Sequence, residues 1–240
     1  MTNEEEKAID LNQLGISAFR AGDTEGALQC FHEAEKFMSS VVREALRTGR
    51  KMDLGNWLII LDHLGCAYLE LGDLGAAYRW SSLATQKAEE ILGAHHRDIG
   101  TFYGNFGRVL LAQNDYGSAE DYFTRALNSL RRHLPEDAPE CMDQIHNLAS
   151  VKMELGDYAA AVDMFEAVLS NQERILGGTH PTLISTFSQL ALAHISCGRW
   201  EPAEEAAQRA AEIAKRSLGA GHPTTGDMEE RLRILRQQAP

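Results

Sequence analysis

The chain has 240 residues, 44% of them hydrophobic, and a mean hydropathy of −0.31, a composition typical of a globular protein. Its formal net charge of −12 argues against binding to the phosphate backbone of a nucleic acid. No apolar run approaches the ~18 residues that a membrane helix needs. The acidic N-terminus, MTNEEEKAID, lacks the basic and apolar regions of a secretory signal. We therefore expect a cytoplasmic protein that binds neither nucleic acid nor membranes.

Five segments of the chain align with one another without gaps, and each predicts a pair of helices. They begin at Leu14, Leu64, Phe106, Leu148 and Leu190. The first two starts are 50 residues apart and the later ones are 42 apart. Each segment contains a turn such as Gly22-Asp23 or Asn114-Asp115. Gly or Asn can end the first helix in a left-handed conformation, and Asp can cap the second.

The second helix of a pair often carries a small residue followed four positions later by Phe. The instances are Ala27/Phe31, Ala119/Phe123 and Ala161/Phe165. Residues four apart share one face of a helix. The pattern therefore predicts that the small residue admits a neighbouring helix closely and that the Phe fills the space beside it.

The predicted helix pairs follow one another along the chain with one longer spacing. They span residues 8–47, 58–93, 100–135, 142–177 and 184–219. Eight additional residues between the first two pairs predict either a longer second helix or a loop near residues 48–53. Residues 224–238 predict a final amphipathic helix, with Met228, Leu232 and Leu235 on the apolar face that covers the last pair.

The segments that join the pairs repeat as well. They read LGAHHRD from Leu92, LPEDAPE from Leu134, LGGTHPT from Leu176 and LGAGHPT from Leu218. In the third, Gly177 permits a turn, Thr179 is the expected cap of the next helix and Pro181 fits its first turn. Histidines in successive joints are separated by about 8–10 Å of helix packing. They cannot share a zinc ion, whose bonds to nitrogen are about 2.0–2.1 Å, so we expect no metal and no cofactor.

These motifs resemble the tetratricopeptide repeat (TPR), and a period of 42 closed by LGxxHP is similar to the kinesin-light-chain branch of that family. HEAT repeats share the length but not the motif order. The resemblance implies an all-α fold: a right-handed α-solenoid of five TPR helix-turn-helix units plus a C-terminal capping helix, in one domain over residues 1–240. Lys152 and His194 stand where the family usually has an apolar residue, so packing in the fourth and fifth units is expected to be looser.

The resemblance also implies that first helices line a concave groove that holds a peptide. The expected groove residues are Gln13, Arg20, His63, Asn105, Arg108, His146, Asn147 and Gln189. Four of them are carboxamides at one repeat position, and a carboxamide can pair with a peptide backbone whatever its sequence. By resemblance, Asn105 and Asn147 are the leading candidates for ligand contact. The alternative is that these amides bridge neighbouring helices within the groove wall.

The charged groove positions are Arg20, Arg108, Asp62, Glu70, Asp143 and Glu154. The acidic excess predicts a partner that is neutral to mildly basic. Catalytic sequence motifs are absent, and a nucleophilic pair of His63 and Cys66 is the weaker alternative to simple packing of those residues. We therefore expect a non-enzymatic adaptor that binds a peptide segment or partner helix. Alternatives are a peptide-responsive sensor that controls a separate effector, and an assembly protein that associates with itself.

Overall fold

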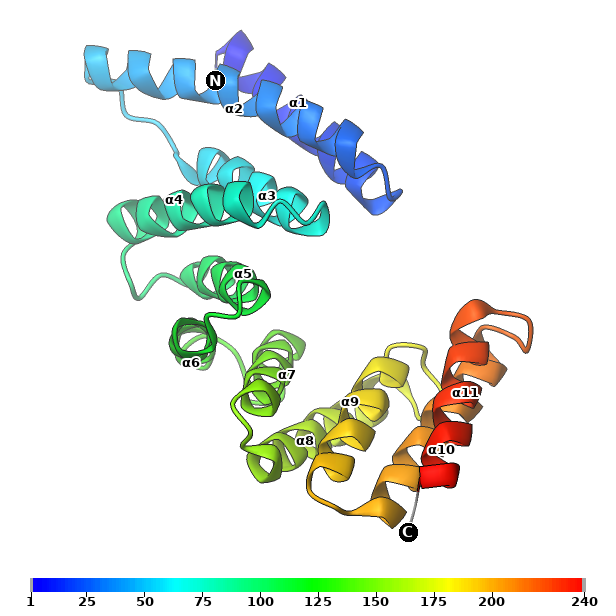
Figure 1. The fold of residues 1–240 in the computed structure, drawn as a ribbon. Helices are drawn as coiled ribbons and strands as arrows, with labels where there is room; N and C mark the ends of the chain where they lie inside the picture. The colour runs from blue at the N-terminus through cyan, green and yellow to red at the C-terminus, as the bar shows by residue number, and fades with distance from the viewer. Residues whose placement is uncertain (1, 239–240) are drawn as a thin grey trace. The chain divides into compact units, whose positions relative to one another are not determined.

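A computed structural model describes residues 2–238, and this part of the chain contains eleven α-helices and no strand (Figure 1). The helices are α1 (Asn3–Arg20), α2 (Thr24–Thr48), α3 (Gly55–Glu70), α4 (Leu74–Leu92), α5 (Ile99–Ala112), α6 (Tyr116–Leu130), α7 (Pro139–Glu154), α8 (Tyr158–Leu176), α9 (Leu183–Ser196), α10 (Trp200–Ser217) and α11 (Pro223–Gln238). The predicted all-α class is confirmed, with five helix pairs and a final helix.

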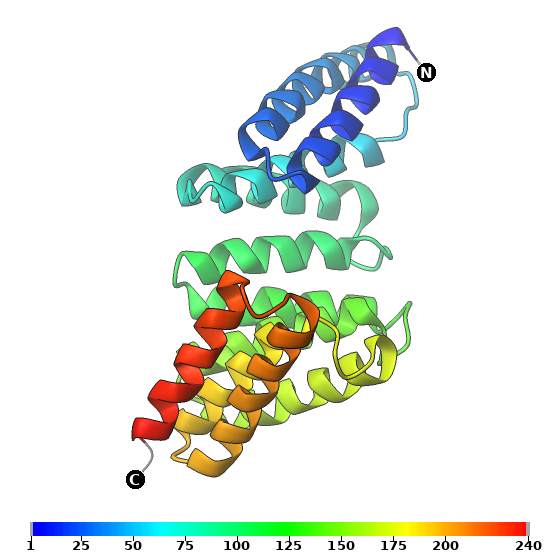
Figure 2. The same cartoon turned by 90° about the vertical axis from the view of Figure 1, so that its right-hand side faces the viewer.

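The helices group into two compact units. Unit 1, Met1–His133, contains α1 to α6, and unit 2, Leu134–Pro240, contains α7 to α11. Within each unit a first helix packs on its own second helix, and that second helix packs on the next first helix. Figure 2 shows this for unit 2, where α11 in red lies alongside α10 in orange. That residues 1–240 act as a single domain stays a prediction.

Small residues on first helices allow the close packing within a pair. In unit 1, Phe31 and Phe123 are almost completely buried and lie over Gly15 and Gly107. A Cβ atom added to Gly107 would lie 2.7 Å from Cε1 of Phe123, closer than two carbon atoms can pack. The small residues predicted four positions before these rings, Ala27 and Ala119, are also completely buried, but the room for each ring comes from a glycine on the first helix, and at Gly107 no methyl group fits.

The turns inside the pairs follow the sequence pattern in four of five cases. The aspartates that cap second helices accept a hydrogen bond from the backbone N–H three residues on: Asp23, Asp73, Asp115 and Asp157. The turns reach φ values of 83° at Gly22 and 62° at Asn114, where Asn tolerates the left-handed conformation. The fifth turn has Arg199 at the cap position, and its side chain makes no capping bond.

The eight additional residues between the first two pairs are divided between a helix and a loop. Helix α2 has 25 residues, whereas the other second helices have 15 to 19. It ends at Gly49 with φ 68°, and the chain then runs without helix to Gly55. The two alternatives offered by the sequence are therefore both realised.

Helix α9 has Thr182 at its N-cap position and no side-chain cap, so the predicted cap at Thr179 is wrong; a histidine bonds within the turn instead. Nδ1 of His180 accepts a hydrogen bond of 3.3 Å from the backbone N–H of Thr182, just before α9 begins. His96 and His222 make the same bond to the residue two positions on, each at 3.2 Å. This bond orders the turn, and Pro181 precedes the helix, which begins at Leu183.

Helix α11 covers the last pair with the face that the sequence predicts. Met228 and Leu235 are buried against α10, and Leu232 is partly buried in the same cluster. At the repeat position where the other first helices carry Gly or Ala, α11 carries Arg233. This guanidinium is exposed and pairs with Glu230 at 2.6 Å.

Candidate functional site

A pocket of about 330 Å³ lies on the face of unit 1 formed by the first helices α1, α3 and α5. Four of the groove residues predicted from the sequence line it: Arg20, His63, Asn105 and Arg108. Its other walls are Ile16, Phe19, Phe31, Asp62, Cys66, Glu70 and Thr101. The repeat register therefore brings side chains from three helices to one hollow that has an apolar floor and a polar rim.

Two hydrogen bonds tie the first helices of unit 1 together beneath this hollow. Oδ1 of Asn12 lies 2.9 Å from Nδ1 of His63, and an amide oxygen only accepts, so the imidazole donates. Nδ2 of Asn105 donates to Oδ2 of Asp62 at 2.7 Å. In both cases the fifth position of one repeat bonds to the sixth position of the next. His63 and Asn105 thus bridge helices, as the alternative interpretation of the amide row had it.

Asp62 is the most perturbed carboxyl group on this face. Only 7% of the residue is exposed, and this burial raises the pKa of its carboxyl to about 7. The hydrogen bond from Asn105 and the charge of Arg108 oppose that rise, because both favour the carboxylate. At neutral pH Asp62 therefore contributes only part of the negative charge that its residue type suggests.

The remaining charges of the pocket are nearly balanced. Nη2 of Arg108 lies 3.3 Å from Oε1 of Glu70, so these two side chains neutralise each other. Arg20 is exposed and makes no ion pair with the residues that the structure describes. Asp62 is buried and Glu70 is paired with Arg108. The net negative charge at this pocket is therefore smaller than the count of acidic residues in the sequence suggests.

The pocket is poorly suited to thiol chemistry. Burial raises the pKa of the Cys66 thiol well above its usual range, and the nearby carboxyl groups of Asp62 and Glu70 raise it further. A nucleophilic cysteine needs the opposite shift. Burial also lowers the pKa of His63, which leaves the imidazole neutral and bonded to Asn12. These two residues are therefore placed for packing.

In unit 2 the predicted groove residues are less tightly bonded. His146 on α7 packs edge-on against Phe165, with ring centroids 5.3 Å apart. Its Nε2 atom is buried without a hydrogen-bond partner among the described residues, and burial lowers its pKa. Asn147 and Gln189 are half-buried, and Gln189 lines a hollow of about 600 Å³ beside α9. Their amides are not used in bridges of the kind that Asn105 makes in unit 1.

Gln13 lies apart from the pocket residues. It is exposed on α1, and its backbone carbonyl accepts a hydrogen bond from the hydroxyl of Ser17 at 3.0 Å. The residue that bonds across to α3 is its neighbour Asn12, which the sequence analysis did not select. The sequence could have indicated the role of Asn12, because Asn12 and Asp62 occupy the same repeat position, directly before the amide row.

The described residues contain no helix with the length and apolarity needed to cross a membrane. Within residues 2–238, no three His, Cys, Asp or Glu side chains lie close enough together to hold a metal ion.

Comparison with known proteins assigns the family. The sequence profile of the tetratricopeptide repeat matches residues 58–132 and 142–216, which is more than half of the chain. The chain belongs to the tetratricopeptide repeat family. Repeats of this family are generally non-catalytic scaffolds for protein interactions, so the chain is assigned to protein interaction in that general sense. No curated protein matches the chain as a whole.

Solved structures with the same fold include kinesin-light-chain-like TPR proteins. A putative kinesin light chain from Podosopora anserina with nearly identical TPR-like repeats is 17% identical, with a TM-score of 0.71 over 91% of this chain and 99% of that one. BtubC (BKLC) from P. vanneervenii is 20% identical, with a TM-score of 0.65 over 93% and 95% of the two chains. The apo form of RapI is 14% identical, with a TM-score of 0.71 over 96% and 84%. These similarities confirm the TPR fold, which the chain shares with kinesin-light-chain-like TPR proteins.

Proposed function

We propose that the chain is a non-enzymatic adaptor that binds an extended peptide segment or a partner helix on the faces of its first helices. One observation carries the proposal: four residues chosen from the repeat register alone line a single pocket in unit 1. This pocket combines the aromatic walls Phe19 and Phe31 with the unpaired guanidinium of Arg20. Concave sites with apolar walls and a few convergent polar groups are typical of binding sites.

The row of amide residues supports the same function, but its members play different parts in the two units. In unit 1, His63 and Asn105 are occupied by bridging hydrogen bonds and present the wall of the site. In unit 2, Asn147 offers a carboxamide that makes no such bridge, and a carboxamide both donates to and accepts from a peptide backbone. We therefore propose Arg20 as the contact residue of the unit 1 pocket and His63 and Asn105 as residues that shape that face, with Asn147 as a separate contact candidate on unit 2.

The charge of the ligand follows from the pairing in unit 1. Glu70 is neutralised by Arg108, and the pKa of Asp62 is raised to about 7 by burial. The face therefore offers little net attraction to a strongly basic segment. Within the range that the sequence predicts, we propose a ligand close to neutral.

The proposal is tested by selecting random dodecapeptides displayed on phage against the full chain and titrating an enriched peptide by fluorescence anisotropy. Changing Arg20 to Ala should weaken binding by roughly tenfold, because a hydrogen bond from a charged group contributes about 1.5–3 kcal/mol. The matched control is Arg79→Ala, an exposed arginine on the second helix α4. Binding that survives Arg20→Ala and is lost in Arg79→Ala would assign the interaction to the second helices instead.

A further inference from the structure

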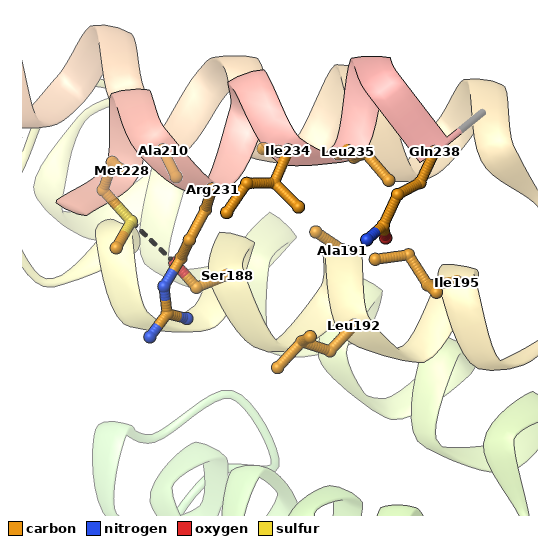
Figure 3. Close-up of a pocket in the computed structure, with 11 residues that line it drawn as sticks. Ser188, Ala191, Leu192, Ile195, Ala210, Met228, Arg231, Ile234, Leu235 and Gln238 are labelled. Atoms are coloured by element: carbon orange, nitrogen blue, oxygen red, sulfur yellow. Dashed lines mark hydrogen bonds between the residues drawn. The ribbon is translucent and has the colours of Figure 1, made fainter.

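The hollow drawn in Figure 3 lies between two first helices, where Ile234 and Leu235 point from α11 toward the helix that carries Ala191 and Ile195. It therefore belongs to the kind of face on which the proposed function already places a ligand. A different hollow, of about 450 Å³, lies in unit 1 along the second helix α2 and the start of α3. It shares no residue with the unit 1 pocket.

This hollow follows the part of α2 that has no equivalent in the other pairs. Helix α2 has 25 residues, whereas α4 and α8, the longest of the other second helices, have 19. All three begin at the same repeat position, so residues 43–48 of α2 extend beyond the regular repeat. The walls of the hollow are Trp57 of α3 and one stripe of α2 that runs from Glu35 to Leu46. We call this hollow the α2 groove.

The extended end of α2 is held in place by the chain that follows it. Gly49 ends the helix with φ 68°, and its backbone N–H donates to the carbonyl of Ala45. Met52 and Leu54 in the following loop pack against the hydrophobic cluster shared by α1, α2 and α3. Leu46 nevertheless remains 76% exposed, more than any other large hydrophobic side chain in the part of the chain that the structure describes. An ordered helix end therefore presents this leucine to a ligand.

Basic side chains line and flank the α2 groove. Residues 36–51 contain five Lys or Arg and one Asp or Glu, a net charge of +4 in a chain whose net charge is −12. The one acidic residue of this stretch, Glu44, pairs with Arg47 at 2.7 Å. Lys36 and Arg43 line the groove and make no ion pair with any residue among 2–238. The groove therefore complements an acidic segment that carries an apolar side chain.

The charges of the groove differ between its two ends. Glu35, at the end nearer the start of α2, accepts a hydrogen bond from the hydroxyl of Ser39. Nε of Arg43 donates to the backbone carbonyl of Ser39 at 3.2 Å, and Leu46 follows one turn later. The acidic side chains of a ligand should therefore lie toward the extended end of α2, where Arg43 and Leu46 stand together.

The spacing of the α2 wall favours a helix as the ligand. Glu35, Ser39, Val42 and Leu46 follow one another at intervals of three or four residues, so they form one ridge about 16 Å long. Helices pack by laying such ridges into the grooves of one another. A membrane surface would instead engage several exposed apolar side chains, and Leu46 is the one exposed large hydrophobic residue of α2.

We propose that the α2 groove docks an acidic amphipathic helix of a partner protein. A large apolar side chain of this helix packs against Leu46 and Trp57, and the Asp or Glu side chains beside it contact Lys36 and Arg43. The apolar contact supplies affinity, and the charges select the partner. The site lies along a second helix and does not use Arg20, so its success or failure is separate from that of the proposed function.

The test uses amphipathic helical peptides with randomised polar faces, displayed on phage and selected against the full chain. Leu46→Glu is the counter-selection, and circular dichroism checks that this exposed helical position tolerates the change. We expect the peptides that bind the natural chain alone to carry an excess of Asp and Glu. Their affinity, measured by fluorescence anisotropy, should fall as the salt concentration rises.

Affinity for these peptides should fall roughly tenfold or more in both Leu46→Glu and Arg43→Glu, because each change sets a carboxylate against the acidic ligand. The matched controls are Leu14→Glu on α1 and Arg79→Glu on α4, which replace exposed residues outside the groove. Both controls should bind as the natural chain does.

The proposal is overturned if no peptide distinguishes the natural chain from Leu46→Glu, or if the peptides that do are neutral or basic. It also fails if vesicles containing phosphatidylserine bind the natural chain but not Leu46→Glu, since the surface is then a lipid site. A dimer in sedimentation that Arg43→Glu dissociates would make the occupant a second copy of this chain and overturn the proposal as well.

Discussion

Asn105 on α5 donates a 2.7 Å hydrogen bond to Asp62 on α3, and this carboxyl group is buried at the base of the unit 1 pocket. The bond joins two residues that are 43 positions apart, one more than the period of the repeat. The amide that the sequence presents as a ligand contact is thus committed to holding two first helices in register. Asp62 in turn makes the stability of unit 1 depend on pH.

Replacing Asp62 with Asn should stabilise the protein at alkaline pH. The folded chain holds a proton on Asp62 up to a pKa of about 7, whereas the unfolded chain releases it near 3.8. The folded state therefore binds more protons between these values, and the Asp62 contribution to the unfolding free energy falls as pH rises through this window. The introduced carboxamide does not titrate, and its oxygen can still accept from Asn105.

The difference between variant and natural chain should grow from pH 4 to pH 8 and reach at least about 1 kcal/mol, since one pKa unit corresponds to about 1.4 kcal/mol. Urea unfolding followed by circular dichroism measures it. Asp163→Asn, at an exposed position on α8, is the control. Parallel stability curves for Asp62→Asn and the natural chain would contradict the burial of this charge.

Replacing His180 with Ala should destabilise unit 2 by about 0.5–1.5 kcal/mol, the range typical of one lost hydrogen bond. The imidazole Nδ1 accepts the backbone N–H of Thr182 within the turn before α9, and Ala leaves that group without its partner. Thr179→Ala is the matched control, because Thr179 makes no capping bond to α9 and should change little. Chemical denaturation distinguishes the two, and an equal loss in both variants would show that the histidine bond does not stabilise the turn.

Replacing Gly107 with Ala should cost about 1–3 kcal/mol through overpacking. Its new methyl group would lie 2.7 Å from Cε1 of Phe123, and a fully buried ring has little room to move. Gly117→Ala on α6 is the opposite case, because an added Cβ would meet no side chain or neighbouring helix within 4 Å and alanine favours helix by roughly 0.5–1 kcal/mol. Thermal melting should therefore move in opposite directions for these two changes; a shared direction would count against close helix packing at Gly107.

Replacing His194 with Leu should stabilise unit 2 by about 1 kcal/mol at neutral pH, because Nδ1 is buried without a hydrogen bond and such groups carry a desolvation cost. Burial also lowers the pKa of His194. The folded state then resists protonation, so the natural chain loses stability as pH falls below the ordinary histidine value of 6.5, and the variant avoids this loss. Acid-induced unfolding tests both effects, and a variant that unfolds at higher pH than the natural chain would refute them.

The repeat register made the fold predictable from sequence. Ala and Phe four residues apart, and Asp after a left-handed Gly or Asn, are local patterns whose geometry is fixed by the helix itself. The register also brought Arg20, His63, Asn105 and Arg108 to one pocket. These features do not depend on which hydrogen bonds form between side chains on different helices.

The hydrogen bonds of the site could not be predicted from the sequence, because they depend on which side chains of neighbouring helices pair with each other. The residue type of Asn105 suits a ligand and Asp62 equally, and its 2.7 Å hydrogen bond to Asp62 depends on how α5 lies beside α3. The hydrogen bond of His180 was missed for a related reason: Thr179 has the residue type of a cap, but the turn places the imidazole next to the N–H of Thr182.

Arg233 stands at the repeat position where a second helix packs closely on its own first helix. A second helix placed against α11 as α10 lies against α9 would meet a paired guanidinium where every earlier first helix offers Gly or Ala. We therefore expect α11 to accept a second helix in this register only if the Arg233 side chain moves aside. Arg233→Ala is the change an engineer would make first to stack another pair on α11.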